Sequence, residues 1–224
     1  KANLAKKLDQ LFSVSSKTSG RDQSDITGLI GQYAHGNEPS HHMAYLYPFV
    51  SQPWKTQHRV HQILNTLYHN NPDGLSGNED CGQMSAWAVL SAMGFYPVTP
   101  GADYYVIGTP WFSKVTINLE NGKKFVINAK NISASNYYIR AASLNGNKHD
   151  ASFLNHSDIM NGGELNFVMG NTPNKSWGTG LKNEPHTAII DNLIVPAPAI
   201  TDAIKSFKDK KTITVTGPAG ASLF

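Results

Sequence analysis

Two short acidic turns carry the side chains in this sequence that could do chemistry. Residues 36–38 and residues 77–79 both read Gly-Asn-Glu, and Asp80 directly follows the second copy. Each copy precedes an apolar stretch with helical spacing, and the free N–H groups at a helix N-terminus favour negative charge. A capping box over residues 80–83 explains one acidic turn without any function. Because capping does not require two similar turns, we predict that both contribute to one functional pocket.

Three predicted helices place these turns side by side. Apolar residues recur at helical spacing over residues 39–50 and 54–68, and residues 81–94 are apolar on every side, which predicts a buried helix. Consecutive antiparallel helices put the first and the third next to each other, pointing the same way. The starts of these two helices then meet. We therefore predict that the side chains of Glu38 and Asp80 lie within about 10 Å of each other.

Two kinds of chemistry fit these turns poorly. The first is a transition-metal site built from His35, His41 and His42. Pro39 interrupts the helix on which a histidine pair would sit, and no His-Glu-x-x-His motif occurs. The second is nucleophilic catalysis by a side chain such as Ser40, which lacks the strand, sharp turn and helix that expose a nucleophile.

Cys81 is the only cysteine, so the sequence has neither a disulfide framework nor a zinc knuckle. A thiolate could be stabilised in the first turn of the predicted helix. The context of a nucleophile elbow is missing here too. We expect Cys81 to be a small buried side chain without a chemical role.

Hydrolysis of a glycoside driven by carboxylates fits the turns better. This reaction needs a carboxylate that activates water, for which Asp80 and Glu79 are candidates. It also needs amides and histidines that hold sugar hydroxyls, and an aromatic platform such as Trp87 for a sugar face. The hard oxygen donors of Asn37 and Glu38 would in addition suit calcium.

The composition narrows the class of protein. Charged residues make up 16% of the 224 residues, against about 25% in an average soluble domain. Low charge with many Asn, Gly and aromatic residues suits extracytoplasmic proteins (periplasmic, cell-surface or secreted) that handle neutral ligands such as sugars. The net charge of +3 and the scattered lysines give no sign of nucleic-acid binding. No apolar run reaches the length of about 18 residues that predicts a membrane span.

The remaining segments are predicted from periodicity and turn chemistry. Residues 2–12 form an amphipathic helix, and the polar residues 13–36, which include Arg21, Asp22, Asp25 and Gln32, are expected to be ordered and functional. After residue 100, short runs rich in Tyr, Val, Ile and Phe alternate with Asn-Gly turns, which predicts an antiparallel sheet or small sandwich packed against the helices. The fold class is therefore α+β.

Three parts of the chain are expected. Residues 1–100 are predicted to be mainly helical and residues 101–185 to form the β region. Residues 186–224 contain a Pro-Ala-Pro boundary and one clear strand over residues 211–216, so we expect a linker and the start of a truncated β module.

The motifs together resemble a known family. The segments around residues 19–28, 31–42, 77–87, 95–97 and 173–178 resemble the exo-acting α-mannosidases of glycoside hydrolase family 92. The resemblance covers residue 1 to about residue 185, and the two Gly-Asn-Glu motifs make it specific. It implies part of an (α/α)6 barrel followed by a β-sandwich region, with calcium at the bottom of a mannose pocket. It also implies hydrolysis of terminal α-mannosyl residues of glycans with inversion, α-1,2 linkages being the first expectation.

The resemblance also implies roles for individual residues. Asp80 would be the general base, with Glu79 as the second choice, and Asn37 and Glu38 would lie in the calcium shell. The expected substrate-binding residues are His35, His41, His42, Asn78 and Trp87.

One departure from the family pattern matters. The family's general acid is a glutamate in an upstream segment with a Trp-Gln-Tyr signature, and no such segment occurs before His35. We therefore expect the N-terminal part of the same enzyme to be this chain's partner, and the 224-residue chain alone not to release mannose. Residues 196–224 resemble, more weakly, the start of an immunoglobulin-like module. The alternative is a non-catalytic carbohydrate-binding or structural fragment.

Overall fold

The computed structural model describes residues 1–19, 23, 26–186, 199–200, 208–210 and 212–216. The chain divides into two compact units, Lys1–His186 and Thr187–Phe224, which are described separately. The predicted contacts of Arg21, Asp22 and Asp25, and the predicted Pro-Ala-Pro boundary, lie outside the described residues. The predicted domain boundaries at residues 100 and 185 stay predictions.

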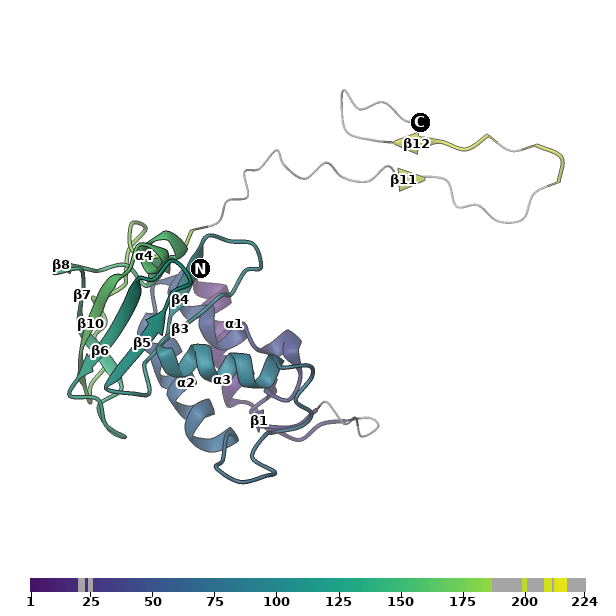
Figure 1. Cartoon of the computed structure of the whole chain (residues 1–224). Helices are drawn as coiled ribbons and strands as arrows, with labels where there is room; N and C mark the ends of the chain where they lie inside the picture. Colours follow the sequence, from purple (N-terminus) through teal and green to yellow (C-terminus); the bar gives the residue numbers. More distant parts are fainter. Residues whose placement is uncertain (20–22, 24–25, 187–198, 201–207, 211, 217–224) are drawn as a thin grey trace. The chain divides into compact units, whose positions relative to one another are not determined.

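Helices make up one side of the first unit (Figure 1). They are α1 (Ala2–Ser13), α2 (Pro53–Leu67) and α3 (Gln83–Met93). The short α4 (His156–Met160) lies instead on the side of the strands. The predicted amphipathic face of α1 buries Leu8 and Phe12, whereas Leu4 stays exposed. Helix α2 confirms the predicted helix over residues 54–68 to within one residue at each end.

The predicted α-helix over residues 39–50 is wrong. This segment forms three short 3-10 helices, η1 (Glu38–Ser40), η2 (Met43–Tyr45) and η3 (Tyr47–Val50). Pro48 provides the physical reason, because proline has no N–H for an α-helical hydrogen bond and disfavours helical geometry in the residue before it. The chain therefore advances in single turns, which still bury Tyr45 and Tyr47 completely.

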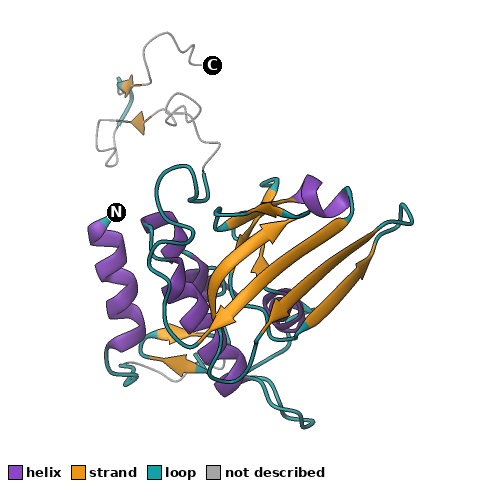
Figure 2. Cartoon of the chain, turned by 90° about the vertical axis from the view of Figure 1, so that its left-hand side faces the viewer, coloured by secondary structure: helices purple, strands orange, loops and turns teal. Residues whose placement is uncertain are grey.

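Ten short strands complete the described part of the first unit, arranged in three sheets. A hairpin joins β1 (Leu29–Ile30) and β2 (Tyr33–Ala34). A three-stranded sheet has the order β3 (Phe95–Tyr96), β4 (Tyr104–Ile107), β9 (Phe153–Asn155). A five-stranded sheet has the order β5 (Lys114–Asn118), β6 (Lys124–Lys130), β10 (Gly163–Gly170), β7 (Tyr138–Leu144), β8 (Asn147–Lys148). Figures 1 and 2 show this sheet beside the helices.

The prediction of a purely antiparallel sheet is wrong at one position. Strand β10 lies between β6 and β7, antiparallel to β7 but parallel to β6, with Phe167 opposite Ala129. The predicted hairpins are confirmed, since β5 pairs with β6 and β7 pairs with β8, both antiparallel. Turn chemistry identifies neighbouring strands that follow each other in sequence. It cannot reveal a later strand that inserts between two earlier ones.

Two hydrophobic clusters hold the first unit together. One surrounds Trp87 and contains Tyr45, Val60 and Ile63 from the helical side. The other lies under the five-stranded sheet and contains Phe125, Ile127 and further alternate residues of its strands, as expected for a sheet with one buried face. The fold thus places the starts of η1 and α3 at the edge of the first cluster.

Helix α3 is less buried than its sequence predicts. Trp87 has no exposed surface, but Val89 on the other side of the helix is 59% exposed. Val89 lines an apolar groove of about 590 Å³ together with residues such as Met93 and Phe112. The prediction that α3 is buried on all sides is therefore wrong for the described residues.

In the second unit, β11 (Ala199–Ile200) pairs antiparallel with β12 (Val215–Thr216), which lies within the strand predicted over residues 211–216. Over the described part of the chain, no helix combines the length and apolar character that crossing a membrane requires.

Candidate active site

The two Gly-Asn-Glu turns meet at their glycines. A Cβ added to Gly77 would lie 3.5 Å from the Cα of Gly36, so the two backbones are in contact. The side chain of Thr27 lies beside both glycines, 2.0 Å from the position of a Cβ on Gly36 and 2.7 Å from that on Gly77. A side chain at either glycine would therefore collide with Thr27. The predicted meeting of the two turns is confirmed, although the segment after the first turn is not an α-helix.

The carboxyl groups of Glu38 and Asp80 are hydrogen-bonded to each other. This confirms the predicted closeness of the two side chains. The pKa of Glu38 lies below its ordinary value, first because its own backbone N–H donates to the carboxylate and second because of the hydrogen bond with Asp80. Both effects favour the ionised form of Glu38.

The carboxylate of Glu79 has different hydrogen-bond partners from that of Glu38. Its carboxylate accepts hydrogen bonds from the backbone N–H groups of Gly82 and Ser85, the latter at 3.1 Å. Hydrogen bonds with Ser85, followed by the one from Gly82, lower the pKa of Glu79. Glu79 therefore caps the start of α3, and the capping box predicted over residues 80–83 does not form.

Asp80 lies in a left-handed turn. Asp80, Cys81 and Gly82 have φ angles of 54°, 55° and 96°. Such angles cost non-glycine residues about 1 kcal/mol or more each, and they keep Asp80 and Cys81 out of helix α3. The prediction that Cys81 is a buried filler is wrong, because its side chain is exposed on this turn.

His35 lies behind the first turn and is completely buried. Its Nδ1 lies 2.7 Å from the hydroxyl of Tyr33 and its Nε2 lies 2.6 Å from the hydroxyl of Tyr68. The Tyr68 hydroxyl donates to the carbonyl of Met84, so it accepts from His35 Nε2–H, and Tyr33 donates to Nδ1. Burial, and to a smaller extent His41, lower the pKa of His35 to about 3. The imidazole is therefore neutral.

His41 joins the two turns through a second set of hydrogen bonds. Its Nε2 donates to the backbone carbonyl of His35 at 2.9 Å, and its Nδ1 accepts from the amide of Gln83 at 2.9 Å. The indole N–H of Trp87 donates to the backbone carbonyl of His41 at 3.0 Å. Burial lowers the pKa of His41. Gln83 thus links the start of α3 to the segment after the first turn.

The burial of these residues corrects their predicted role. His35 and Trp87 have no exposed surface, and His41 is 2% exposed. A side chain that contacts a sugar needs an accessible face, so these three support the turns from behind. The predicted site residues at the surface are His42 and Asn37, which are half-buried, and Asn78, which is exposed.

The sequence patterns did not predict three residues of this site. Gln83 has the form of a capping residue, Tyr68 falls at the end of a predicted helix, and Thr27 lies in a segment without periodicity. Their hydrogen bonds reach residues that are distant in sequence. No local pattern signals such contacts.

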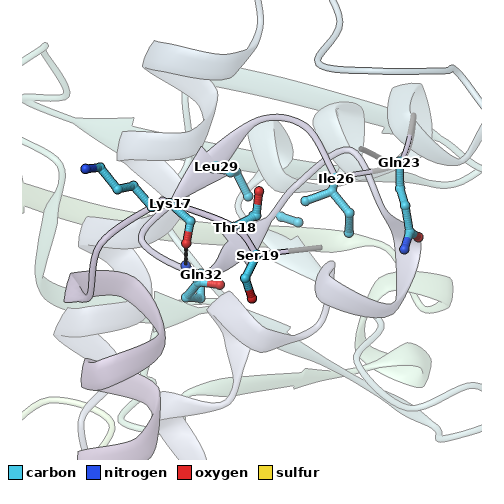
Figure 3. Close-up of a pocket in the computed structure, with 8 residues that line it drawn as sticks. Lys17, Thr18, Ser19, Gln23, Ile26, Leu29 and Gln32 are labelled. Carbon is cyan, nitrogen blue, oxygen red and sulfur yellow. Dashed lines mark hydrogen bonds between the residues drawn. The ribbon is translucent and has the colours of Figure 1, made fainter. Parts of the chain in front are cut away.

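A cavity of about 630 Å³ lies next to the β1–β2 hairpin (Figure 3). Lys17, Thr18 and Ser19 line it from the segment after α1, and Ile26 lines it from the segment that enters β1. The amide of Gln32 donates to the carbonyl of Lys17 at 3.2 Å, which holds this segment to the hairpin. The predicted polar contact of Gln32 is thus an internal one.

The oxygen donors at the two turns set limits on a metal site. Within the ranges that the structure describes, no group of three or more His, Cys, Asp and Glu side chains is placed to hold a metal ion. The site offers the carboxyl groups of Glu38 and Asp80 and the amide of Asn37. A hard cation such as calcium, which takes carboxylate, amide and water oxygens, suits this set better than zinc does.

Comparison with known proteins identifies the family of this chain. Residues 1–171 match the family model described as the glycosyl hydrolase family 92 catalytic domain. An uncharacterized secreted glycosidase of Arthroderma benhamiae is 33% identical over 153 residues, which cover 67% of this chain and 20% of that protein.

Two solved structures from Bacteroides thetaiotaomicron are also similar. A family 92 α-mannosidase in complex with mannoimidazole is 43% identical, with a TM-score of 0.79, over 82% of this chain and 24% of that one. A family 92 inverting mannosidase is 40% identical, with a TM-score of 0.72, over 83% of this chain and 26% of that one.

The chain spans between about a fifth and about a quarter of the length of these relatives. Most of the first unit is nevertheless covered by the match to the family model, including both acidic turns and the buried histidines behind them. On this match, the chain belongs to glycoside hydrolase family 92.

Proposed function

We propose that this chain is part of an exo-acting α-mannosidase that removes terminal α-mannosyl residues from glycans with inversion. The linkage that we expect it to cleave is α-1,2. Membership of the family supports the reaction class. The relative in complex with mannoimidazole and the relative named as an inverting mannosidase support the sugar and the stereochemistry. The name of a related secreted glycosidase supports the further proposal that this protein acts outside the cytoplasm.

The contact between Glu38 and Asp80 is the observation that carries this proposal. It brings two carboxyl groups together from turns that are far apart in the sequence. Of the two candidate bases, Glu79 is occupied by the amides of α3. Asp80, which is half-buried on the left-handed turn, is therefore the proposed general base that activates water.

We further propose that Asn37 and Glu38 bind calcium. This proposal depends on the oxygen donors of both side chains, which are of the type that calcium prefers. When bound, calcium would anchor sugar hydroxyls and would favour the ionised form of both neighbouring carboxyl groups. His42 and Asn78, which reach the surface, are the proposed contacts of the substrate.

An inverting glycosidase needs a second carboxyl group that protonates the leaving oxygen, about 6.5–9.5 Å from the base. We propose that the N-terminal part of the same enzyme supplies this acid. The 224-residue chain by itself is then expected to release no mannose from an α-mannoside.

The test uses the full-length enzyme and α-1,2-linked mannobiose. Asp80→Ala should reduce mannose release by a factor of about 10³ or more, because it removes the base. Cys81→Ala, the neighbouring residue on the same turn, is the matched control and should retain most activity. Proton NMR of the first product should show β-mannose, the anomer that inversion produces. An active Asp80→Ala variant would remove Asp80 from the role of base, and α-mannose as first product would overturn inversion.

A further inference from the structure

Thr27 occupies the point where three separate segments of the backbone meet. Its hydroxyl donates to the backbone carbonyl of Ser76 at 3.2 Å, just before the second acidic turn. Its own carbonyl accepts from the backbone N–H of Gly36 at 3.1 Å, at the start of the first turn. One residue therefore holds both turns, one through its side chain and the other through its main chain.

The neighbouring contacts make this arrangement rigid. The N–H of His35 donates to the carbonyl of Gly28 at 3.2 Å, which continues the β1–β2 hairpin up to the first turn. On the other side, the hydroxyl of Ser76 donates to the carbonyl of Leu67 at 3.2 Å, at the end of α2. Both turns are thus attached to regular elements, and Thr27 is the link between them.

We propose that Thr27 is a positioning residue that sets the spacing of the two turns and thereby of the carboxyl groups of Glu38 and Asp80. This inference rests on the proposed function, because those groups are the proposed calcium ligand and general base. Thr27 acts through the backbone of residues 36 and 77. The Thr27 hydroxyl lies so close to both glycines that a Cβ added to either one would collide with it.

The choice of substitutions depends on this geometry. Thr27→Ser keeps the hydroxyl that bonds the carbonyl of Ser76. Thr27→Val replaces the hydroxyl by a methyl group, which is larger and cannot donate a hydrogen bond, and should push the two glycines apart. Thr27→Ala removes the hydroxyl without adding bulk, so it serves if Thr27→Val does not fold. Thr56→Val is the matched control, because the buried Thr56 hydroxyl also donates to a backbone carbonyl, that of Ala44 at 2.8 Å.

The first measurement is steady-state kinetics of the full-length enzyme. A displacement of about 1 Å in a catalytic group typically costs up to ~10²-fold in rate. Thr27→Val and Thr27→Ala should therefore lower kcat by about 10- to 100-fold with KM changed by less than about 3-fold. Thr27→Ser should restore kcat to within about 2-fold of the wild type. Thr56→Val should lower the unfolding temperature but leave kcat close to that of the wild type.

The second measurement does not depend on activity. The α-protons of Gly36 and Gly77 are close enough for a nuclear Overhauser effect in the isolated 224-residue chain. This signal should persist in Thr27→Ser and disappear in Thr27→Val and Thr27→Ala. Persistence of the signal in both of the latter variants would overturn the proposal. If the signal behaves as expected while the full-length wild type releases no mannose, the proposed function fails and the link made by Thr27 stands.

Discussion

The two Gly-Asn-Glu turns have the same three residues and different uses. In the first turn, Glu38 is hydrogen-bonded to a carboxyl group of the other turn. In the second turn, Glu79 bonds the amides of its own helix. The side chain of the second turn that faces Glu38 is therefore that of Asp80, one position later. Identical tripeptides do not imply identical roles.

The residues directly after each tripeptide explain the difference. Pro39 comes after the first and starts a 3-10 turn, in which the backbone N–H of Glu38 bonds its own side chain. A left-handed turn over residues 80–82 comes after the second and directs the free N–H groups of α3 at Glu79. Because those N–H groups lack partners within the helix, Glu79 satisfies them and Asp80 is left for the first turn.

Substitutions at matched positions of the two turns should differ most in their effects on activity and on its calcium dependence. In the full-length enzyme, Glu38→Gln should lower kcat/KM by about 10²–10⁴-fold, as expected for loss of a charged group at a reacting centre. Asn37→Ala should raise the calcium concentration for half-maximal activity by about 10-fold or more, since it removes a proposed oxygen ligand. Asn78→Ala, the matched control, should leave that calcium concentration within about 2-fold of the wild type.

Chelation provides the corresponding test of the metal. The wild-type enzyme should lose activity in chelator and regain it with calcium but not with zinc. Full activity after exhaustive chelation, or equal effects of Asn37→Ala and Asn78→Ala on calcium dependence, would remove the metal from the first turn.

The next largest difference is expected in stability, between Gly36 of the first turn and Gly82 of the left-handed turn that follows the second. A Cβ on Gly36 would lie 2.0 Å from the Thr27 hydroxyl and 2.5 Å from the Ser76 carbonyl. Gly36→Ala should therefore destabilise the chain by about 3 kcal/mol, the cost of overpacking. Around Gly82 no atom lies within 4 Å of the added Cβ, so Gly82→Ala should cost only the left-handed backbone strain of about 1–2 kcal/mol. Urea unfolding measures both values, and equal losses would show that contact is not what requires glycine at position 36.

The buried imidazole behind the first turn predicts a dependence of stability on pH. The pKa of His35 is about 3 in the folded chain, against an ordinary value of 6.5. Between these values the unfolded chain binds the additional proton, so stability present above pH 6.5 is lost as the pH falls toward 3. The loss through His35 should reach about 2 kcal/mol at pH 5. Urea unfolding at pH 7 and pH 5 should show a smaller difference for His35→Gln than for the wild type, whereas the exposed His69→Gln should behave like the wild type.

The smallest effect should come from the capping glutamate. Glu79→Ala removes the acceptor for two amides at the start of α3 and should lower the unfolding temperature by a few degrees, about the size expected for one lost cap. The full-length variant should keep its activity to within about 3-fold. If Glu79→Ala instead abolishes turnover without unfolding the protein, the general base is Glu79 and not Asp80.

The sequence alone predicted that the two acidic turns meet. Two acidic tripeptides before apolar segments predicted that Glu38 and Asp80 lie close together, and the structure confirms this contact. Periodicity also predicted α1 and α2, and the Asn-Gly turns predicted two hairpins. These features depend on neighbours in the sequence, so local patterns carry enough information for them.

Only the tertiary structure decided which site residues are exposed and which are buried behind the turns. Cys81 is exposed because the left-handed turn keeps it out of α3, and His35, His41 and Trp87 are buried because they bond one another and residues distant in the chain. The insertion of β10 beside β6 is decided in the same way. Burial and hydrogen-bond partners across long sequence separations depend on how all segments pack together, and residue order by itself does not specify that packing.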